Sequence, residues 1–351
     1  MWRYIAIRLL LIGPTLFGIM LVNFTIVQFA PGGPVEQTLL KLETSQYAPT
    51  LEAARITHQH PTSRQHLPQE IIAQITAQYG FDKPAHIRFW LMLKNYVLFD
   101  FGDSYYRDAS VLSLIAEKLP TSISLGLWST LLIYLISIPL GIKKALQHRS
   151  HFDIWTSTLI VVAYAIPGFL FAIILIVIFA GGSYLDWLPL RGLTSDHFNT
   201  LSLAGKIKDY LWHLILPLTA YTIGGFATLT LLTKNSFLDE INKHYVTTAI
   251  AKGLNDKQVL YGHVFRNSML IIIASFPTAI VSIFFTGSLL IEVIFSLDGI
   301  GLLSYEAIIN RDYPIVFSTL YIFTLISLLL KLLSDLIYHW VDPRIHFDNR
   351  K

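Results

Sequence analysis

The chain of 351 residues contains no cysteine and few charged residues. The absence of cysteine excludes disulfides, thiolate metal sites and palmitoylation. Only 14% of the residues are charged, whereas a soluble domain carries about a quarter, so charged side chains are too few to cover a water-facing surface. The net charge of +3 is small and spread along the chain, which indicates no nucleic-acid partner.

The sequence also lacks the motifs of nucleotide-binding proteins and hydrolases. It contains no G-x-x-x-x-G-K-[ST], no H-E-x-x-H and no G-x-S-x-G. His58, His60 and His66 lie close together, but neither a helical i, i+4 pair nor neighbouring carboxylates support a metal site there. We therefore expect no catalytic residue, no cofactor and no metal, and the energy for any work must come from outside the chain.

What the sequence does contain is a set of long uncharged stretches. At 1.5 Å per residue, a stretch of 24 residues reaches about 36 Å, which is enough to cross a hydrocarbon core of about 30 Å. The first stretch has no small-x-small cleavage site after it, which favours a retained anchor over a signal peptide. The pattern predicts an all-α polytopic membrane protein with six transmembrane helices, at Leu9–Val35, Leu119–Ile142, Ile154–Leu185, Tyr210–Thr233, Asn267–Ile291 and Tyr313–Leu330.

The basic residues between these stretches predict the orientation. One set of short segments, which includes both ends of the chain, holds 14 Lys and Arg residues, whereas the short loops on the other side hold four. Short cytoplasmic loops carry the excess of basic residues. Both termini are therefore expected in the cytoplasm.

The chain divides into three parts on this pattern. Residues 1–35 form the cytoplasmic end and the first span, residues 36–118 an outer loop, and residues 119–351 a core with spans two to six. Apolar spacing predicts a small helical subdomain in the outer loop, and the polar stretch Gln46–Gln65 is expected to be mobile. Its three short helices are expected at 68–79, from Pro84 to Lys94 with Asp82 as N-cap, and from Ser110 to Pro120.

The centres of the spans hold no Asp, Glu, Lys, Arg or His. An ion-coupled transporter usually carries such residues deep in its spans as proton or ion relays. This argues against a self-contained secondary transporter or channel. A membrane-embedded scaffold or assembly factor is the remaining alternative of a different class.

The longest cytoplasmic loop, residues 234–266, has the pattern of a docking element. A helix over Leu238–Gly253 places Leu238, Ile241, Tyr245 and Ala249 on one face. Gly253 is expected to end it, and Asn255 or Asp256 to cap a second helix. An amphipathic helix between two spans suits a groove on a partner protein, although a helix that lies on the lipid surface has the same pattern.

A resemblance to a known family favours a helix that docks on a partner protein over one that lies on the lipid surface. Thr247-Thr248-Ala249 followed by Gly253 matches, with two substitutions, the E-A-A-x-x-x-G motif of binding-protein-dependent ABC importer permeases. Thr248–Gly253 is similar to the T-A-x-A-K-G variant of the dipeptide, oligopeptide and nickel branch. Further matches to that branch follow in order along the chain: Pro31–Pro34, Tyr79–Pro84, Asp100–Ser104, Arg266-Asn267, Glu292–Phe295 with Gly299 and Gly301, Arg311–Pro314 and Asp342–Arg344.

Within the branch, the chain looks most like the B permease of the microcin C and oligopeptide importers (Yej type). The P-G-G-P sequence, the long first outer loop and the block Leu232–Glu240 carry that likeness. A dipeptide or nickel permease is the alternative. The resemblance implies a type I ABC importer permease in the bacterial inner membrane, which imports peptides and is not itself an enzyme. The implied partners are a second permease subunit, ATP-binding cassette subunits and a periplasmic peptide-binding protein, besides the lipid bilayer.

The same resemblance implies roles for particular residues. It implies that a coupling helix contacts the ATPase through Leu238, Ile241, Tyr245, Thr247, Thr248, Ala249 and Gly253. The position of Glu292 at the outer end of the fifth span, with Gly299 and Gly301 after it, suits a periplasmic gate or a contact with a peptide amino group. The alternatives are that Glu292 bonds nearby backbone and that the two glycines let the chain turn.

Overall fold

The computed structural model describes residues 2–29, 82–182, 184–285 and 288–341, and these ranges are helical with one isolated β-bridge and no strand. They form two compact units. Unit 1 comprises Met1–Leu9, Ile115–Tyr305 and Phe323–Lys351, and unit 2 comprises Leu10–Leu114 and Glu306–Ile322. The predicted helix at 68–79, the polar stretch Gln46–Gln65 and the three histidines lie outside the described residues.

Five of the described helices are long and apolar enough to cross a membrane, and the bent pair α6–α7 supplies a sixth candidate. This agrees with the predicted all-α polytopic class. The elements are α1 (Trp2–Phe29), α4 (Ala85–Val97), α5 (Val111–Leu146), α6 (His151–Ala165), α7 (Gly168–Phe179), η1 (Phe198–Thr200), α8 (Leu203–Ile241), α9 (His244–Ala251), α10 (Asp256–Val259), η2 (Leu260–Val264), α11 (Phe265–Phe285), α12 (Ser288–Ile294), α13 (Ile300–Asn310) and α14 (Tyr313–Val341).

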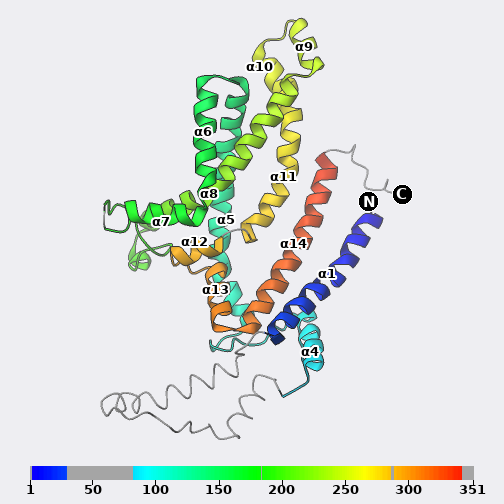
Figure 1. Ribbon diagram of the computed structural model, residues 1–351, viewed down its shortest axis with the longest axis vertical. Helices are drawn as coiled ribbons and strands as arrows, with labels where there is room; N and C mark the ends of the chain where they lie inside the picture. Colours follow the sequence, from blue (N-terminus) through cyan, green and yellow to red (C-terminus); the bar gives the residue numbers. More distant parts are fainter. Residues whose placement is uncertain (1, 30–81, 183, 286–287, 342–351) are drawn as a thin grey trace. The chain divides into compact units, whose positions relative to one another are not determined.

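The third predicted span is not one straight helix. The chain bends by 97° between α6 and α7, so that α7 runs crosswise to α6 (Figure 1). Ile166 is extended at the joint, with φ −85° and ψ 118°. Pro167 follows it, and a proline disfavours the helical conformation of the residue before it.

Two predictions for the outer loop need correction. The third short helix does not stop at Pro120, because α5 continues through Pro120 and Pro139 to Leu146. A proline removes one helical hydrogen bond, but ending the helix inside an apolar span would leave several backbone groups unpaired. The second helix begins after Pro84, where no side chain caps it, so the predicted Asp82 cap is absent.

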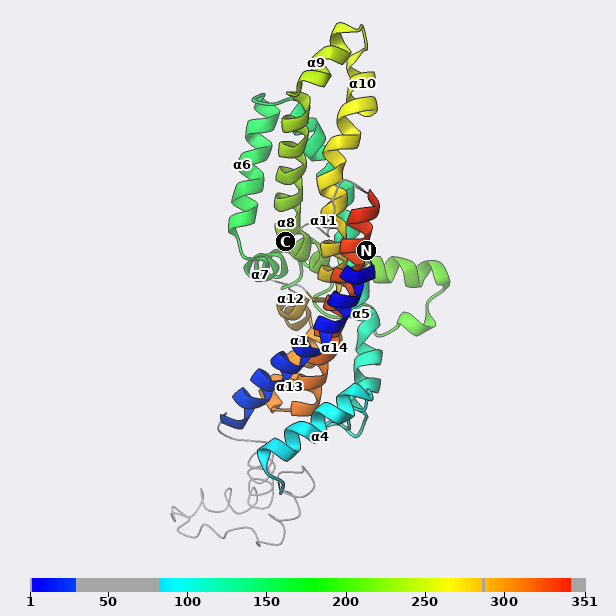
Figure 2. The same cartoon turned by 90° about the vertical axis from the view of Figure 1, so that its right-hand side faces the viewer.

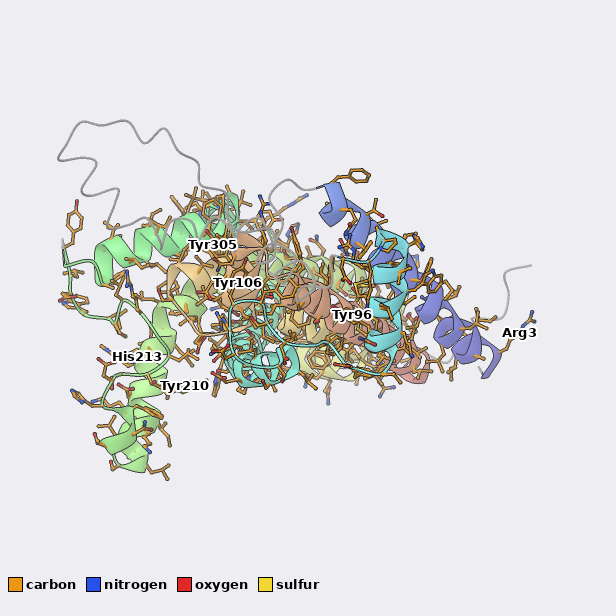
Figure 3. All side chains as sticks on the ribbon, turned by 90° about the horizontal axis from the view of Figure 1, so that it is seen from below. Arg3, Tyr96, Tyr106, Tyr210, His213 and Tyr305 are labelled. Carbon is orange, nitrogen blue, oxygen red and sulfur yellow. The ribbon has the colours of Figure 1, made fainter. Side chains whose placement is uncertain are left out.

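Unit 1 holds two apolar clusters at different levels of its helices. One packs α5, α7, α8 and α12 through residues such as Leu125, Leu214 and Phe295. Hydrogen bonds of Ser124 and Trp128 with the hydroxyl of Tyr210 tie the first turns of α8, which also carry His213, to α5 (Figure 3). The other cluster packs the end of α5 against α8, α9, η2 and α11.

Unit 2 brings two of the recognised motifs together. The buried carboxylate of Asp312 accepts hydrogen bonds from the hydroxyl of Ser104 and from the backbone N–H of Tyr105. The end of the Asp100–Ser104 motif is therefore hydrogen-bonded to the aspartate of the Arg311–Pro314 motif. Around it, the rings of Tyr96, Phe101 and Tyr321 meet edge to face or tilted, with centroids 4.9 to 5.9 Å apart.

Candidate functional site

The segment that the sequence singled out lies beyond the ends of α8 and α11, where α9 and α10 form a tip (Figures 1 and 2). Gly253 follows α9 with φ +86°, and Asn255 makes a capping box at the start of α10. Both features agree with the predicted stop and cap. The predicted continuous helix over Leu238–Gly253 is wrong, because α8 ends at Ile241 and α9 starts at His244.

A polar cluster fixes α9 to the two long helices. The buried carboxylate of Glu240 on α8 accepts hydrogen bonds from the hydroxyl of Tyr245 at 2.6 Å and from the amide of Asn267 on α11 at 3.0 Å. Lys243 forms an ion pair with the other oxygen of Glu240 at 2.6 Å. Burial and the hydrogen bond to Glu240 raise the pKa of the Tyr245 hydroxyl, so Tyr245 stays a neutral donor. Glu240 is the shared partner of the other three residues in this cluster. The sequence alone did not point to it.

The two faces of α9 differ from the predicted arrangement. Val246 and Ala249 are 4% and 7% exposed and pack into the apolar cluster of their own chain. Leu238, Ile241 and Tyr245 pack against the same cluster. The prediction that the Ala249 side chain faces a partner is therefore wrong for this subunit, because the break after α8 turns that face inward. The side chains left exposed on α9 include Thr247, Thr248 and Ile250, the last of them 53% exposed.

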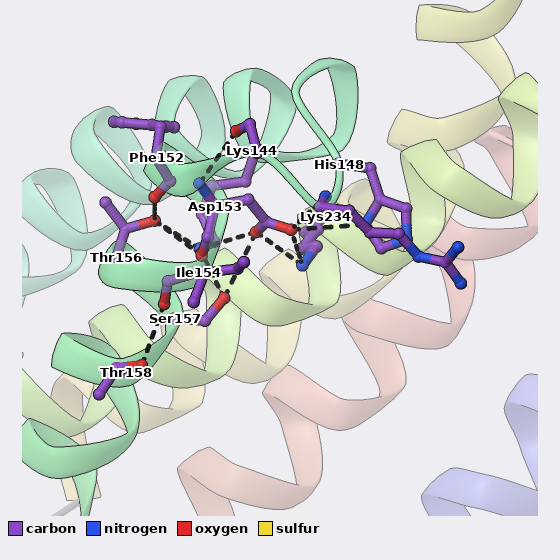
Figure 4. Close-up of polar contacts among 11 residues, drawn as sticks. Lys144, His148, Phe152, Asp153, Ile154, Thr156, Ser157, Thr158 and Lys234 are labelled. Atoms are coloured by element: carbon purple, nitrogen blue, oxygen red, sulfur yellow. Dashed lines mark hydrogen bonds and ion pairs between the residues drawn. The ribbon is translucent and has the colours of Figure 1, made fainter.

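A second polar cluster ties α5, α6 and α8 together near the same end of unit 1 (Figure 4). The carboxylate of Asp153 receives the ammonium of Lys234 on both oxygens, at 2.7 and 2.8 Å, and that of Lys144 at 3.1 Å. Lys144 is fully buried and also donates to the hydroxyls of Thr156 and Ser157. Lys144 is one of the basic residues counted for the orientation, and nothing in the local sequence signals that its partner is Asp153.

Glu292 lies in a third buried cluster. One oxygen of its carboxylate accepts from the hydroxyl of Ser122 at 2.7 Å, and the other from the backbone N–H of Leu302 at 3.0 Å. A carboxylate at this place stabilises the positive end of α13. A Cβ on Gly299 or Gly301 would lie 2.5 or 2.7 Å from the second oxygen, so both positions are glycine because the carboxylate fills that space. The role of these residues as a gate stays a prediction.

A comparison with protein families matches residues 137–347 to the binding-protein-dependent transport system inner membrane component. The match covers more than half of the chain. The chain belongs to this family.

Full-length relatives extend this match to the whole chain. The chain is similar to the inner membrane ABC transporter permease protein YejB of Escherichia coli O157:H7, with 56% identity over 365 residues and all of both chains covered. It is as similar to the peptidoglycan transport system permease protein YejB of Agrobacterium fabrum, 56% identical over 362 residues with full coverage of both. The oligopeptide transport system permease protein AppB of Bacillus subtilis is 33% identical over 348 residues, which cover 99% of this chain and 100% of that one.

Among solved structures, the fold resembles an inward-facing MetNI methionine ABC transporter. The TM-score is 0.51 at 12% identity, over 66% of this chain and 97% of that one. The predicted resemblance to ABC importer permeases and the predicted fold class are both confirmed. This permease is a multi-pass inner-membrane component of a transport system, and its family implies a partner permease, an ATPase and a binding protein.

Proposed function

We propose that this permease is one half of a heterodimeric pathway that imports oligopeptides, and that ATP hydrolysis in separate cassette subunits drives it. The names of its relatives support a peptide substrate, since one is an oligopeptide permease and another a peptidoglycan permease. Peptides released from the cell wall fit both names. Microcin C-like peptides are a narrower case of the same substrate class.

The main support for the proposal is the way in which hydrogen bonds attach α9 to the long helices α8 and α11. Glu240 bonds α9 at Tyr245 and α11 at Asn267, so a push on α9 reaches two long helices through short polar contacts. The exposed face of α9 is uncharged at Thr247, Thr248 and Ile250, as suits a helix that inserts into a groove. We place the ATPase on this face, with Gly253 turning the chain back behind it.

The orientation follows from the same assignment. If α9 binds a cytoplasmic ATPase, both termini are cytoplasmic and the loop at 36–118 faces the periplasm, where a peptide-binding protein delivers the substrate. Single cysteines test this cleanly because the chain has none of its own. Cysteines at His197 and Tyr305 are expected to react in intact cells with an impermeant maleimide, and cysteines at His148 and Thr247 only after the cells are opened. Labelling of Thr247→Cys from outside would invert the orientation.

Ile250→Asp is expected to separate the permease from its ATPase. The side chain is 53% exposed, so the change leaves the internal packing of α9 intact. In a docked complex it would bury an unpaired charge, which costs several kcal/mol, and every 1.4 kcal/mol is a factor of ten. Co-purification of the ATPase with the tagged permease should fall at least tenfold, while the second permease subunit stays bound.

Leu203→Asp is the matched control. Leu203 is an exposed apolar residue, 77% exposed, at the other end of the protein's longest described helix. ATPase binding should not change in this variant. Equal ATPase binding by the Ile250→Asp and wild-type permeases would remove α9 from the docking surface.

A further inference from the structure

A cavity of about 940 Å³ lies in unit 1 at the joint between α6 and α7. Residues of the joint itself line it, together with residues of α5, α8, α11 and α12. Its volume is at the upper end of the range of about 300 to 1,000 Å³ that is typical of ligand sites. It is separate from the α9 face and from the three polar clusters described above.

The lining is uncharged but not wholly apolar. Among the described residues that line the cavity there is no Asp, Glu, Lys, Arg or His. Hydroxyl groups come from α5, α6, α8 and α11, among aliphatic side chains and the glycine pair Gly224-Gly225. The residues that supply these hydroxyls are Thr130, Tyr134, Tyr164, Tyr221, Thr228 and Ser275.

The backbone is not helical at the joint between α6 and α7, although both helices are apolar. Pro167 has no N–H, so the carbonyl of Ala163 cannot accept the usual helical bond from it. The first turn of α7 starts at Gly168, and the N–H groups of a first turn have no partner within their own helix. Backbone of this kind is tolerated at membrane depth only inside protein or beside a hydrated cavity. Water in this cavity could therefore hydrogen-bond to the backbone at the break between α6 and α7, whereas lipid tails could not.

We propose that this cavity holds a segment of the imported peptide, bound through its backbone and its uncharged side chains. Hydroxyls and the N–H groups of the first turn of α7 can pair with peptide N–H and C=O groups whatever the peptide's sequence. The absence of lining charge means that this site does not select peptides by charge. The proposal rests on the proposed function and adds a place and a mode of recognition to it.

Charge placed in the cavity should create a selectivity that the permease lacks. Thr228 lines the cavity, and its hydroxyl bonds only loosely to the backbone of its own helix, at 3.3 Å. The test uses the complete importer in proteoliposomes and two labelled tetrapeptides that differ only in a lysine or a glutamate at the second position. Thr228→Lys should lower the ratio of lysine-peptide to glutamate-peptide uptake about tenfold, and Thr228→Glu should raise it about tenfold.

Thr219 supplies the control on the same helix. It is exposed, its hydroxyl donates to the carbonyl of Ile215 four residues earlier at 2.6 Å, and it does not line the cavity. Thr219→Lys and Thr219→Glu should leave the uptake ratio of the two peptides at its wild-type value. Gly224→Leu adds bulk without charge, because nothing lies within 4 Å of an added Cβ there. It should lower uptake of both peptides at least tenfold while the complex still assembles.

The outcomes separate the two proposals. A wild-type complex that imports neither peptide with ATP overturns the proposed function itself. Wild-type uptake of both peptides with an unchanged ratio in the two Thr228 variants overturns the peptide site alone. Loss of the second permease subunit from the Thr228 and Gly224 variants would also overturn it, because the cavity would then be a contact between subunits.

Discussion

Asp153→Asn is expected to be among the most destabilising single changes in the described part of the chain. It leaves the fully buried ammonium of Lys144 and the ammonium of Lys234 without the carboxylate that holds both. Removing one partner of a buried ion pair costs about 3 to 5 kcal/mol. The midpoint of thermal unfolding in detergent should fall by more than about 5 °C, and the yield of the assembled complex should fall with it.

Two further variants show whether the buried charge is the cause. Asp239→Asn removes an exposed carboxylate from the same helix as Lys234 and should leave the unfolding midpoint unchanged. The double variant with Lys144→Met and Asp153→Asn also removes the fully buried one of the two stranded cations, so it should be more stable than Asp153→Asn alone. If the double variant is the less stable of the two, the ion cluster does not account for the loss.

Gly299→Ala is expected to have the second largest effect. Its Cβ would lie 2.5 Å from a carboxylate oxygen of Glu292 and 2.7 Å from the hydroxyl of Ser122. Those atoms cap α13 and are themselves buried, so they cannot move without breaking hydrogen bonds. Overpacking costs about 1 to 3 kcal/mol, and an unpaired buried polar group adds to it.

The measurement is the unfolding midpoint of purified single and double variants. Gly224→Ala is the control, because an added Cβ there meets nothing within 4 Å, and it should not lower the midpoint. Glu292→Ala removes the carboxylate that the alanine at 299 would strike. The Gly299→Ala change should therefore cost much less in the Glu292→Ala background than in the wild type, and additive losses would mean that the two residues act independently.

Local signals in the sequence predicted the elements that short-range chemistry decides. Gly253 was expected to end one helix and Asn255 or Asp256 to cap the next; Gly253 does so through its backbone conformation and Asn255 through a capping box. Proline was less informative. Pro14, Pro120, Pro139 and Pro217 lie inside helices, whereas Pro167 marks a 97° bend, and the difference depends on what packs around each.

The polar clusters could not be predicted from one sequence. Lys234 lies 81 residues from Asp153, and Asn267 lies 27 residues from Glu240, so no local pattern pairs them. The resemblance did point to Glu292, Gly299 and Gly301, but only the structure shows that the glycines leave room for the carboxylate. The inward turn of Ala249 follows from the break between α8 and α9, which amphipathic periodicity does not reveal.

The most direct test of the account is peptide uptake by the purified complex in proteoliposomes. The permease, its second permease subunit, the ATPase and the binding protein would be combined with a labelled tetrapeptide. Uptake is expected only with ATP and binding protein present, and dissipating proton and sodium gradients should not change it. Uptake that persists without ATP and follows an ion gradient would contradict the account and mark the chain as part of a secondary transporter.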